Sequence, residues 1–389
     1  MQDSGSSSQK KRARPLVLDV HVPAESRSYP VLIGRGMLGR VGAELKQRLG
    51  TAGQVALITD QNVARLHGAA VRASLEAQGL SVVSIVIPPG EDTKSMPTLL
   101  GVLEQMIHGG LGRRDAVVAL GGGVIGDLSG MAAALFMRGI PVVQVPTSLL
   151  AQVDASVGGK VAVDLPGAKN MVGAFHFPLF VAIDPEVLST LPDREMGQGL
   201  AEMLKHALLF SSDHLEQLLA KADAIYARDV DTITPLVATS VGLKSACVGR
   251  DPWEQGEAGK GRVLLNLGHT LGHAIEAASN YQVPHGEAVA LGLRASARLS
   301  ELRGVAEPGL EDMVTAALER LRLPRDLDAW LVGERGAAVE RALAVDKKRG
   351  GGTVSYVALA RVGDPLVLTI SPKEIIGLLR QRAQLPASG

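Results

Sequence analysis

Residues 262–287, RVLLNLGHTLGHAIEAASNYQVPHGE, hold three of the nine histidines of the chain. His269 and His273 are four residues apart, so both would lie on one face of a helix, and His285 follows in a Pro-His-Gly turn. Neutral imidazole is the commonest metal-binding side chain, and a catalytic zinc takes about three nitrogen or oxygen ligands. The stretch therefore predicts a metal site; the alternative is a pair of helix-face histidines bonded to the backbone. Two polar residues precede it, Arg262 and Asn266.

The composition predicts a large protein core in two domains. The chain has 389 residues, 46% of them hydrophobic and only 3% aromatic, which suits packed helices and parallel strands. Lys+Arg and Asp+Glu both number 40, so the charge balance argues against a nucleic-acid or acidic-lipid partner. The single cysteine, Cys247, excludes an intrachain disulfide framework and fits a reducing cytosol. A cytoplasmic protein is expected.

The N-terminal segment and the apolar runs of the sequence predict a soluble chain. Residues 1–14 are polar, with a basic run at 10–14, and we expect a disordered tail rather than a signal peptide because no apolar run follows. No apolar stretch reaches membrane-spanning length without polar interruption. A membrane partner is therefore not expected.

The first half of the chain alternates strand-like and helix-like segments. Residues 16–22 and 29–33 read as an edge hairpin, and 179–183 as the last strand. The βαβ rhythm between them predicts a parallel sheet. The expected strands are 54–59, 81–87, 115–120 and 142–145, and the expected helices 38–49, 63–78 and 96–108. Because Asp184-Pro185 stops the last strand, the predicted domains are 15–185 and 186–389, after the tail.

Glycine-rich segments follow two of these strands. Gly121, Gly123 and Gly126 match GxGxxG between a strand and a helix-like run at 128–137. Such glycines let backbone N–H groups approach a phosphate; the alternative is a tight turn with packing glycines. Asp60, at the end of an earlier strand, is a candidate ribose ligand. Further on, Lys160 and the 167–170 run place lysines in predicted Gly-rich loops, which indicates an anion cradle. The alternative is solvated loop lysines, and for Lys160 or Lys169 alone that alternative would be favoured.

The second half of the chain has the helical period. Residues 195–210 carry Glu202, Lys205 and His206 in an otherwise apolar segment. A buried glutamate needs a partner, and a metal ion is one option. Further helices are expected at 235–248, 288–303, 309–320, 338–343 and 372–383, with a strand pair beginning near residue 354.

Ten motifs occur together and in order: PPGEDTK (88–94), GGGVIGD (121–127), FMRG (136–139), PTSLLAQVDASVGGK (146–160), GAKN (167–170), LPDRE (191–195), GLAEMLKHA (199–207), LNLGHTLGHAIE (265–276), PHGEAVALG (284–292) and DKK (346–348). In this combination the chain resembles the 3-dehydroquinate synthase family, sugar phosphate cyclases of the shikimate pathway. The resemblance covers about residues 16–380. GGGVIGD alone would also fit NAD- and metal-dependent alcohol dehydrogenases of the same fold.

The resemblance implies an α/β N-terminal Rossmann-like domain with a parallel sheet and a mostly α-helical C-terminal domain. It implies NAD in the cleft between them and one divalent metal, zinc or cobalt, held by Glu202, His269 and His285. It thereby replaces the pairing of His269 with His273 that spacing suggested. The implied NAD-contacting residues are Asp60, Asn62, Glu91, Lys94, Gly123, Val124, Ile125, Gly126, Asp127, Thr147, Ser148, Lys160, Lys169, Thr190 and Glu195.

The implied substrate is 3-deoxy-D-arabino-heptulosonate 7-phosphate. Transient oxidation by NAD, elimination of phosphate, return of the hydride and an intramolecular aldol would give 3-dehydroquinate. The implied catalytic and substrate residues are Arg138, Asp154, Lys160, Asn170, Lys205, Lys244, Arg262, Asn266, His273 and Lys347. Of these, Lys160, Asn170, Arg138 and Lys347 would hold the phosphate, and Arg262 with Lys244 the carboxylate. The arginine equivalent to Arg138 reaches the neighbouring subunit in the family, which implies a homodimer.

Two departures from the family pattern concern the Lys244–Arg262 spacer and Ser148. The spacer is longer than usual, with Asp251-Pro252 in place of an Asp-Glu pair, and Ser148 replaces a common threonine. Two rival activities remain. A 2-epi-5-epi-valiolone synthase would act on sedoheptulose 7-phosphate, but such relatives typically change the positions of Asn266 and His273, which are retained here. A polyol dehydrogenase of the same fold would not need the phosphate cage. A binding module without catalytic activity would hold a structural metal, and such a site would be closed by four protein ligands.

Overall fold

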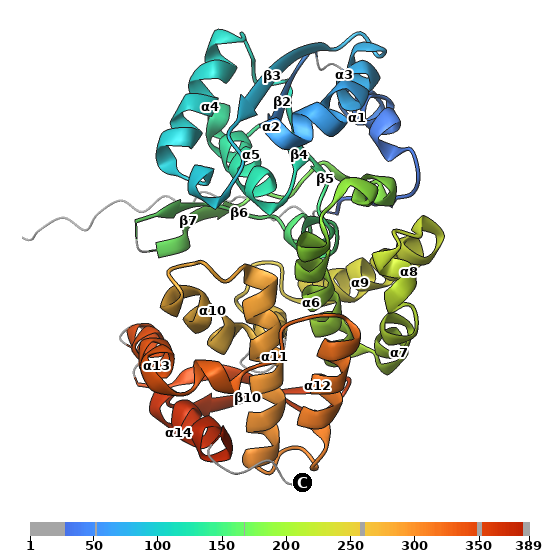
Figure 1. Cartoon of the computed structure of the whole chain (residues 1–389). Helices are drawn as coiled ribbons and strands as arrows, with labels where there is room; N and C mark the ends of the chain where they lie inside the picture. Colours follow the sequence, from blue (N-terminus) through green and yellow to red (C-terminus); the bar gives the residue numbers. More distant parts are fainter. Residues whose placement is uncertain (1–27, 51–52, 167, 257–260, 348–351, 384–389) are drawn as a thin grey trace, which may run out of the picture.

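The computed structural model describes residues 28–50, 53–166, 168–256, 261–347 and 352–383. The predicted tail and the first predicted strand, 16–22, lie outside these ranges. Figure 1 shows an α/β half above and a helical half below, with the β6–β7 hairpin (Lys160–Leu165 and Ala168–Phe175) between them. No helix among the described residues combines the length and apolarity needed to cross a bilayer.

The α/β half is built on a parallel sheet, as predicted. Within the described residues its six strands run in the order β1-β8-β5-β4-β2-β3, and every pairing is parallel. Strands β4 and β5 are buried along their whole length, because both faces of the sheet are covered by helices. The strands are β1 (Val31–Ile33), β2 (Gln54–Asp60), β3 (Ser81–Ile87), β4 (Ala116–Gly121), β5 (Val142–Pro146) and β8 (Phe180–Ile183).

Helices cover both faces of this sheet. One face packs against α1 (Val41–Leu49) and α3 (Ala69–Glu76) through residues such as Leu45 and Leu75. The other packs against α4 (Met96–His108) and α5 (Gly123–Leu135) through Leu99 and Leu128. The chain leaves β2 for β3 on one side and then returns to form β4 on the other side of β2. This reversal makes the carboxyl ends of β2 and β4 the expected ligand crevice of an open α/β sheet.

Two local predictions in this half are wrong. The helix after β4 begins at Gly123, not at residue 128, so only Gly122 separates strand from helix. Gly126 is inside that helix, where an added Cβ would lie 2.9 Å from Gln144 Oε1 on β5. Lys160 and Lys169 are not in loops but in the antiparallel strands β6 and β7. The polar and glycine residues of β7, AKNMVGAF, hid the strand.

The helical half begins with α6 (Asp193–Phe210). Its other helices are α7 (Ser212–Ala220), α8 (Ala222–Tyr226), α9 (Val230–Arg250), α10 (His269–Ala278), α11 (His285–Leu302), α12 (Leu310–Arg320), α13 (Gly333–Lys347) and α14 (Pro372–Ala383), with the hairpin β9 (Val354–Arg361) and β10 (Asp364–Ile370). Helix α9 starts five residues before the predicted Pro235, because the Asp229 side chain accepts a hydrogen bond from the Asp231 N–H and caps it. Helix α13 is also longer than predicted.

One hydrophobic core joins the two halves. It combines Val181 and Ile183 of β8 with apolar residues of α6, α9 and α11. A second core in the helical half lies among α10, α11, α13 and α14. The junction at residue 185 is therefore packed, and the side chains on either side of it are held at fixed relative positions.

Candidate active site

Glu202, His269 and His285 converge from three helices. Glu202 of α6 is fully buried, and its Oε1 lies 3.6 Å from His269 Nε2 and 3.5 Å from His285 Nε2. Within the described residues Oε1 accepts no hydrogen bond. A buried carboxylate oxygen facing two imidazole nitrogens, with no donor of its own, is the arrangement a cation would complete. One carboxylate and two imidazoles also match the donors of open catalytic zinc sites.

The outer nitrogens of both imidazoles are already engaged. His269 Nδ1 lies 3.1 Å from the Leu267 carbonyl oxygen, to which it donates. His285 Nδ1 lies 3.4 Å from Glu276 Oε2. Each contact leaves Nε2 facing Glu202, and Nε2 is the nitrogen that each imidazole, once neutral, would offer to a metal ion. The residues present thus fit a divalent metal ion.

Glycine contacts bring the three helices close enough for this convergence. An added Cβ at Gly292 of α11 would lie 1.8 Å from the Gly268 carbonyl oxygen, at the start of α10. At Gly286 of α11 it would lie 2.3 Å from Gln198 Cα on α6. Only glycine permits such approaches. The first residues of α10 and α11, which are His269 and His285, are thereby held against α6.

A second buried group of charges adjoins the ligands. Lys205 of α6 pairs with Glu202 and lies 3.8 Å from Asp154 Oδ1. Lys244 of α9 lies 2.8 Å from the same oxygen and donates to the Asp154 backbone carbonyl at 2.6 Å. Asp154 belongs to the turn of helix at Ala151–Ala155, in the α/β half. Two ammonium groups and two carboxylates therefore balance inside one buried cluster.

Burial and pairing shift the pKa values of these groups in opposite directions. Burial would raise the pKa of Glu202, but the Lys205 ammonium outweighs it and holds that pKa well below its usual range. Burial and Lys205 lower the pKa of His269. Burial would also lower the pKa of His285, but Glu202 and Glu276 outweigh it and raise the pKa to about 10. Without a metal, His285 is thus the proton-carrying imidazole of the pair.

The pKa values of Lys244 and Lys205, the two buried lysines of this cluster, are shifted in opposite directions. Burial lowers the pKa of Lys244, and the neighbouring Lys205 adds to this, against the opposing effect of Asp154. For Lys205 the two carboxylates outweigh burial, so its pKa is raised. His206, which follows it, is buried with a lowered pKa, and its Nδ1 bonds with Ser240 Oγ at 2.8 Å. Sites where neighbours push pKa values apart are typical of acid–base chemistry.

The predicted dinucleotide residues lie around the crevice between β2 and β4. The Asp60 carboxylate ends β2 and accepts hydrogen bonds from the Asn62 and Val63 N–H groups. Gly123 opens α5, whose free N–H groups can receive a phosphate. Ile125 is buried in the core, so only its backbone is available to a ligand. Val124 occupies the same first turn.

Lys94 joins the segments that flank this crevice. Its Nζ lies 2.5 Å from Asp127 Oδ2 on α5 and 2.5 Å from Asn170 Oδ1 on β7. Burial raises the pKa of Asp127, against the opposing effect of Lys94. Lys169, next along β7, lies 3.5 Å from Glu91 Oε1.

Four other predicted NAD residues lie on segments after β5 and β8. Thr147 donates its N–H to the Gly121 carbonyl at 2.9 Å, and Ser148 accepts a hydrogen bond from the Ala151 N–H. Thr190 Oγ1 lies 3.1 Å from Nε2 of His67, in the segment that precedes α3. Glu195 Oε2 accepts a hydrogen bond from Gln198 at 2.7 Å. Thr147 and Ser148 thus lie at the carboxyl end of β5, whereas Thr190 and Glu195 lie on the helical segments that follow β8.

The predicted phosphate-binding residues are not all brought together. Lys160 is the first residue of β6 and pairs with Glu254. Asn170 lies near the other end of the hairpin and accepts a hydrogen bond from Lys94. Arg138 is exposed, with a left-handed φ of 66°. Lys347 ends α13, and its side chain lies outside the described residues. In this conformation Lys160 and Asn170 have no common partner.

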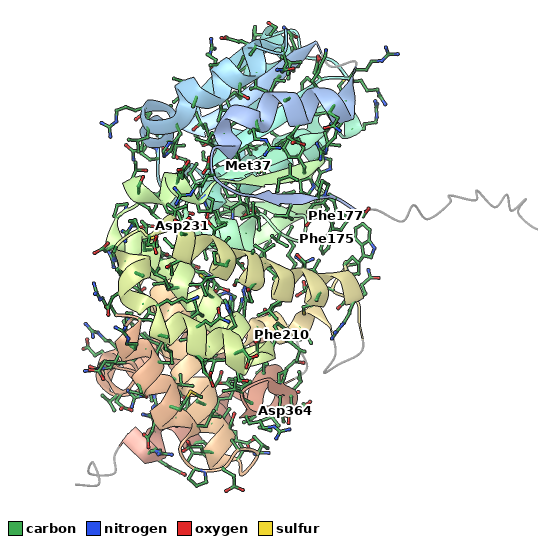
Figure 2. The ribbon with its side chains drawn as sticks, turned by 90° about the vertical axis from the view of Figure 1, so that its right-hand side faces the viewer. Met37, Phe175, Phe177, Phe210, Asp231 and Asp364 are labelled. Atoms are coloured by element: carbon green, nitrogen blue, oxygen red, sulfur yellow. The ribbon has the colours of Figure 1, made fainter. Side chains whose placement is uncertain are left out.

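The predicted carboxylate-binding arginine is held next to Lys160. Arg262 is 4% exposed and donates to the Gly158 and Pro252 carbonyls at 3.0 and 3.1 Å. Trp253 of the longer spacer stacks edge-on against Phe175 and Phe177, which Figure 2 labels close together where the two halves meet. Asn266 ends the short helix Arg262–Asn266, and His273 lies with its ring 5.2 Å from that of His269.

Two carboxylates at this site were not among the predicted residues. Glu276 lies seven residues after His269 and three after His273, a helical spacing that could have identified it. Together with His273 and His285 it offers a second group of possible ligand atoms, within 4.8 Å of one another. Glu254, which pairs with Lys160, lies in the longer spacer, and no sequence pattern identified it.

Comparisons with known proteins agree with this geometry. Residues 84–198 match the family model described as 3-dehydroquinate synthase N-terminal, and residues 199–349 match 3-dehydroquinate synthase C-terminal. A 3-dehydroquinate synthase from Symbiobacterium thermophilum is 42% identical over 349 residues, covering 89% of this chain and 96% of the relative. One from Caulobacter vibrioides is 41% identical, covering 90% and 95%.

Two solved structures share the fold. A 2-epi-5-epi-valiolone synthase from Streptomyces hygroscopicus with NAD+ and Zn2+ bound has a TM-score of 0.82 and 26% identity, covering 93% of this chain and 99% of that one. A 2-deoxy-scyllo-inosose synthase complexed with carbaglucose-6-phosphate, NAD+ and Co2+ has a TM-score of 0.79 and 25% identity, covering 92% and 97%.

Proposed function

The chain belongs to the 3-dehydroquinate synthase family, and we propose that it converts 3-deoxy-D-arabino-heptulosonate 7-phosphate to 3-dehydroquinate and phosphate through the site described above. It is a lyase whose cofactors are NAD and a divalent metal ion, zinc or cobalt. When bound, NAD takes up and returns a hydride, and the metal polarises substrate hydroxyl groups. The protein's own residues bind, orient and exchange protons around that chemistry.

Glu202, His269 and His285 would hold the metal. The observation that carries this assignment is their convergence from α6, α10 and α11 on one point, beside the charge-balanced group of Lys205 and Asp154. Three ligands leave a position open for substrate. The neighbouring ammonium groups favour an anionic substrate over bulk water there.

The anionic groups of the substrate would be held by residues on both sides of the junction. Arg262 and Lys244 lie against the segment 154–160 and would bind the carboxylate. Lys160 would bind the phosphate after releasing Glu254, since a dianion competes strongly with a single carboxylate for an ammonium group. Arg138, Asn170 and Lys347 are proposed as further phosphate contacts. Binding both ends of a flexible sugar acid lowers the entropic cost of ring closure.

Proton transfer would fall to His273 and Lys205, and Asn266 would form hydrogen bonds to the substrate. The ring of His273 lies 6.1 Å from that of His285, so a substrate bound at the metal would meet it. The phosphate being eliminated can also carry protons, and the buried lysines keep that anion in place. Asp154 would hold Lys205 and Lys244 in position rather than touch the reacting carbons.

The proposed dinucleotide site follows the crevice at Asp60 and Gly123, with Lys94 and Lys169 on its hairpin side. With a boundary near residue 185, most proposed cofactor residues would fall in 15–185, apart from Thr190 and Glu195, and the metal residues and most substrate residues in 186–389. The proposed substrate residues of the first part are Arg138, Asp154, Lys160 and Asn170.

The test is phosphate release with a catalytic amount of NAD, from the heptulosonate phosphate and in parallel from sedoheptulose 7-phosphate. We expect many phosphates per NAD from the first substrate only, with no net NADH and a product consumed by dehydroquinate dehydratase. NADH accumulating in proportion to product would indicate a dehydrogenase. Release from sedoheptulose 7-phosphate alone would indicate a valiolone-type cyclase.

We also propose that the chain acts as a homodimer in the cytoplasm. Exposed apolar side chains lie on adjoining elements: Leu100 and Ile107 on α4, Met137 beside Arg138, and Met171 on β7. A second copy is the occupant we propose, because the exposed Arg138 directly follows Met137, and in the family that the chain resembles the equivalent arginine reaches the neighbouring subunit. Light scattering should give twice the 40.6 kDa chain mass, and Ile107→Glu should give monomers. A fully active monomer in the unaltered chain would contradict the dimer.

A further inference from the structure

Glu276 lies between the metal ligands and the β6–β7 hairpin. Its side chain is 7% exposed, with Oε2 at 3.4 Å from His285 Nδ1 and Oε1 at 4.0 Å from Lys169 Nζ. The two oxygens of one carboxylate thus face a metal ligand on one side and a predicted NAD residue on the other. Helix α10 supplies both Glu276 and His269, so the carboxylate is rigidly placed relative to the site.

The position of Lys169 is equally well defined. Its ammonium group lies 4.5 Å from the centre of the Tyr281 ring and 3.5 Å from Glu91 Oε1. Tyr281 donates its N–H to the Glu276 carbonyl at 2.7 Å, which fixes the turn after α10. Lys169 belongs to the α/β half and Glu276 to the helical half. Their contact is therefore a direct electrostatic link between the proposed NAD site and the proposed metal site.

We propose that Glu276 is a positioning residue that orients His285 for metal binding, and that Lys169, acting through Glu276, makes zinc and NAD bind cooperatively. The cooperative part rests on the proposed function, in which Lys169 contacts NAD. Carboxylates that hold the second nitrogen of a ligating histidine typically change metal affinity by about 10- to 100-fold. No other acid takes this role on His285 among the described residues, because its other ring nitrogen faces Glu202.

The direction of the coupling follows from charge. In the free chain the Lys169 ammonium offsets part of the Glu276 charge and so weakens its effect on His285. When a dinucleotide phosphate attracts that ammonium, the Glu276 charge acts fully on the His285 ring and the cation bound to it. Zinc should then bind more tightly in the presence of NAD, and NAD by the same factor in the presence of zinc, because such linkage is reciprocal.

The experiment measures zinc affinity of the metal-free full chain by competition with a chromophoric chelator, with and without saturating NAD. For the unaltered chain we expect NAD to tighten zinc binding at least fivefold, at the lower end of typical couplings. Glu276→Gln should weaken zinc binding by about 10- to 100-fold and reduce the NAD effect below twofold. Lys169→Met should bind zinc at least as tightly as the unaltered chain without NAD, and should also lose the NAD effect.

Glu287→Gln is the matched control. Glu287 is another acid at the start of α11, but it pairs with Arg194, so this variant should keep both the zinc affinity and the NAD effect within twofold. Zinc binding of Glu276→Gln within threefold of the unaltered chain would overturn the positioning role. So would loss of one of two bound zinc ions in that variant, which would make Glu276 a ligand with His273. An NAD effect retained in both Glu276→Gln and Lys169→Met would overturn the coupling.

Failure of the proposed function would look different. If the chain bound no NAD, the unaltered protein would show no NAD effect, yet Glu276→Gln would still weaken zinc binding. Thermal melting of the metal-free variants checks that each is folded. Lys169→Met changes a hairpin side chain that is only 28% exposed but lies outside the cores, so it separates coupling from folding.

Discussion

Metal binding at this site should displace one proton, and that proton should come from His285. In the metal-free chain Glu202 and Glu276 outweigh burial and raise the pKa of His285 to about 10, so at pH 7.5 its imidazole carries a proton. Burial lowers the pKa of His269, which is already neutral. A ligand must be deprotonated before it binds. The site therefore exchanges one proton for one metal ion.

The cost of this exchange can be estimated. Removing a proton 2.5 pH units below the pKa costs about 3.4 kcal/mol, at 1.36 kcal/mol per unit. The His285 side chain is 32% exposed, so solvent screening reduces this, and we take about 1.5–3 kcal/mol. Apparent metal affinity should accordingly rise about tenfold per pH unit between pH 7 and 9, as expected for one proton released per metal bound.

The assay is calorimetric titration at pH 7.5 in buffers of different ionisation enthalpy, which counts protons. Cadmium is the suitable probe because its bound water keeps its protons at this pH. About one proton per cadmium is expected. A count below about 0.3, or an affinity independent of pH, would refute the assignment of the proton to His285. The raised pKa of His285 also affects the stability of the metal-free chain. Because this pKa is higher in the folded than in the unfolded chain, the proton on His285 stabilises the fold fully below about pH 6.5. That stability is lost as the pH rises through about 10, so metal-free Tm should fall over this range.

Three further substitutions test the site. His285→Ala should reduce bound metal below one per chain, measured by atomic emission, and abolish turnover, whereas exposed His108→Ala should do neither; full metal content in the first would remove His285 from the ligands. Lys160→Ala should lower kcat/KM because it loses about 2–4 kcal/mol of transition-state binding. The exposed Lys373→Ala should leave kcat/KM unchanged. A fall in kcat/KM of less than about threefold for Lys160→Ala would mean that Lys160 is only a solvated lysine. Gly292→Ala should cost about 1–3 kcal/mol of stability by forcing α11 away from α10, and an unchanged Tm and zinc affinity would show that the close approach is dispensable.

The sheet could be predicted because its strands are buried on both faces. Strands such as β2 and β4 are short, nearly continuous apolar runs bounded by glycine or charged residues, and that pattern has few other interpretations. Helix ends were less predictable. The start of α9 depends on capping by Asp229, and the start of α5 on glycines that a local interpretation assigns to a loop.

The proposed metal ligands were only partly predictable from the residues alone. Helical spacing pairs His269 with His273, yet the third dimension brings Glu202 and His285 to His269 from separate helices. Spacing along one helix cannot report which side of it faces another. The order of motifs identified Glu202 through the family resemblance. The contact of Lys169 with Glu276 had no sequence signal, because it joins segments from opposite halves of the chain.

The buried cluster of two ammonium groups and two carboxylates combines residues from both halves of the chain. This affects the order in which the site can form during synthesis. Chains leave the ribosome N-terminus first, and domains tend to fold in that order. Asp154 therefore emerges before Lys205 and Lys244, whose buried charges it neutralises. Glu202 emerges after Asp154 and before both lysines, but His269 and His285 emerge only when about 70% of the chain has been made. A growing chain cannot assemble the three-ligand site early, so metal uptake marks the nearly finished molecule.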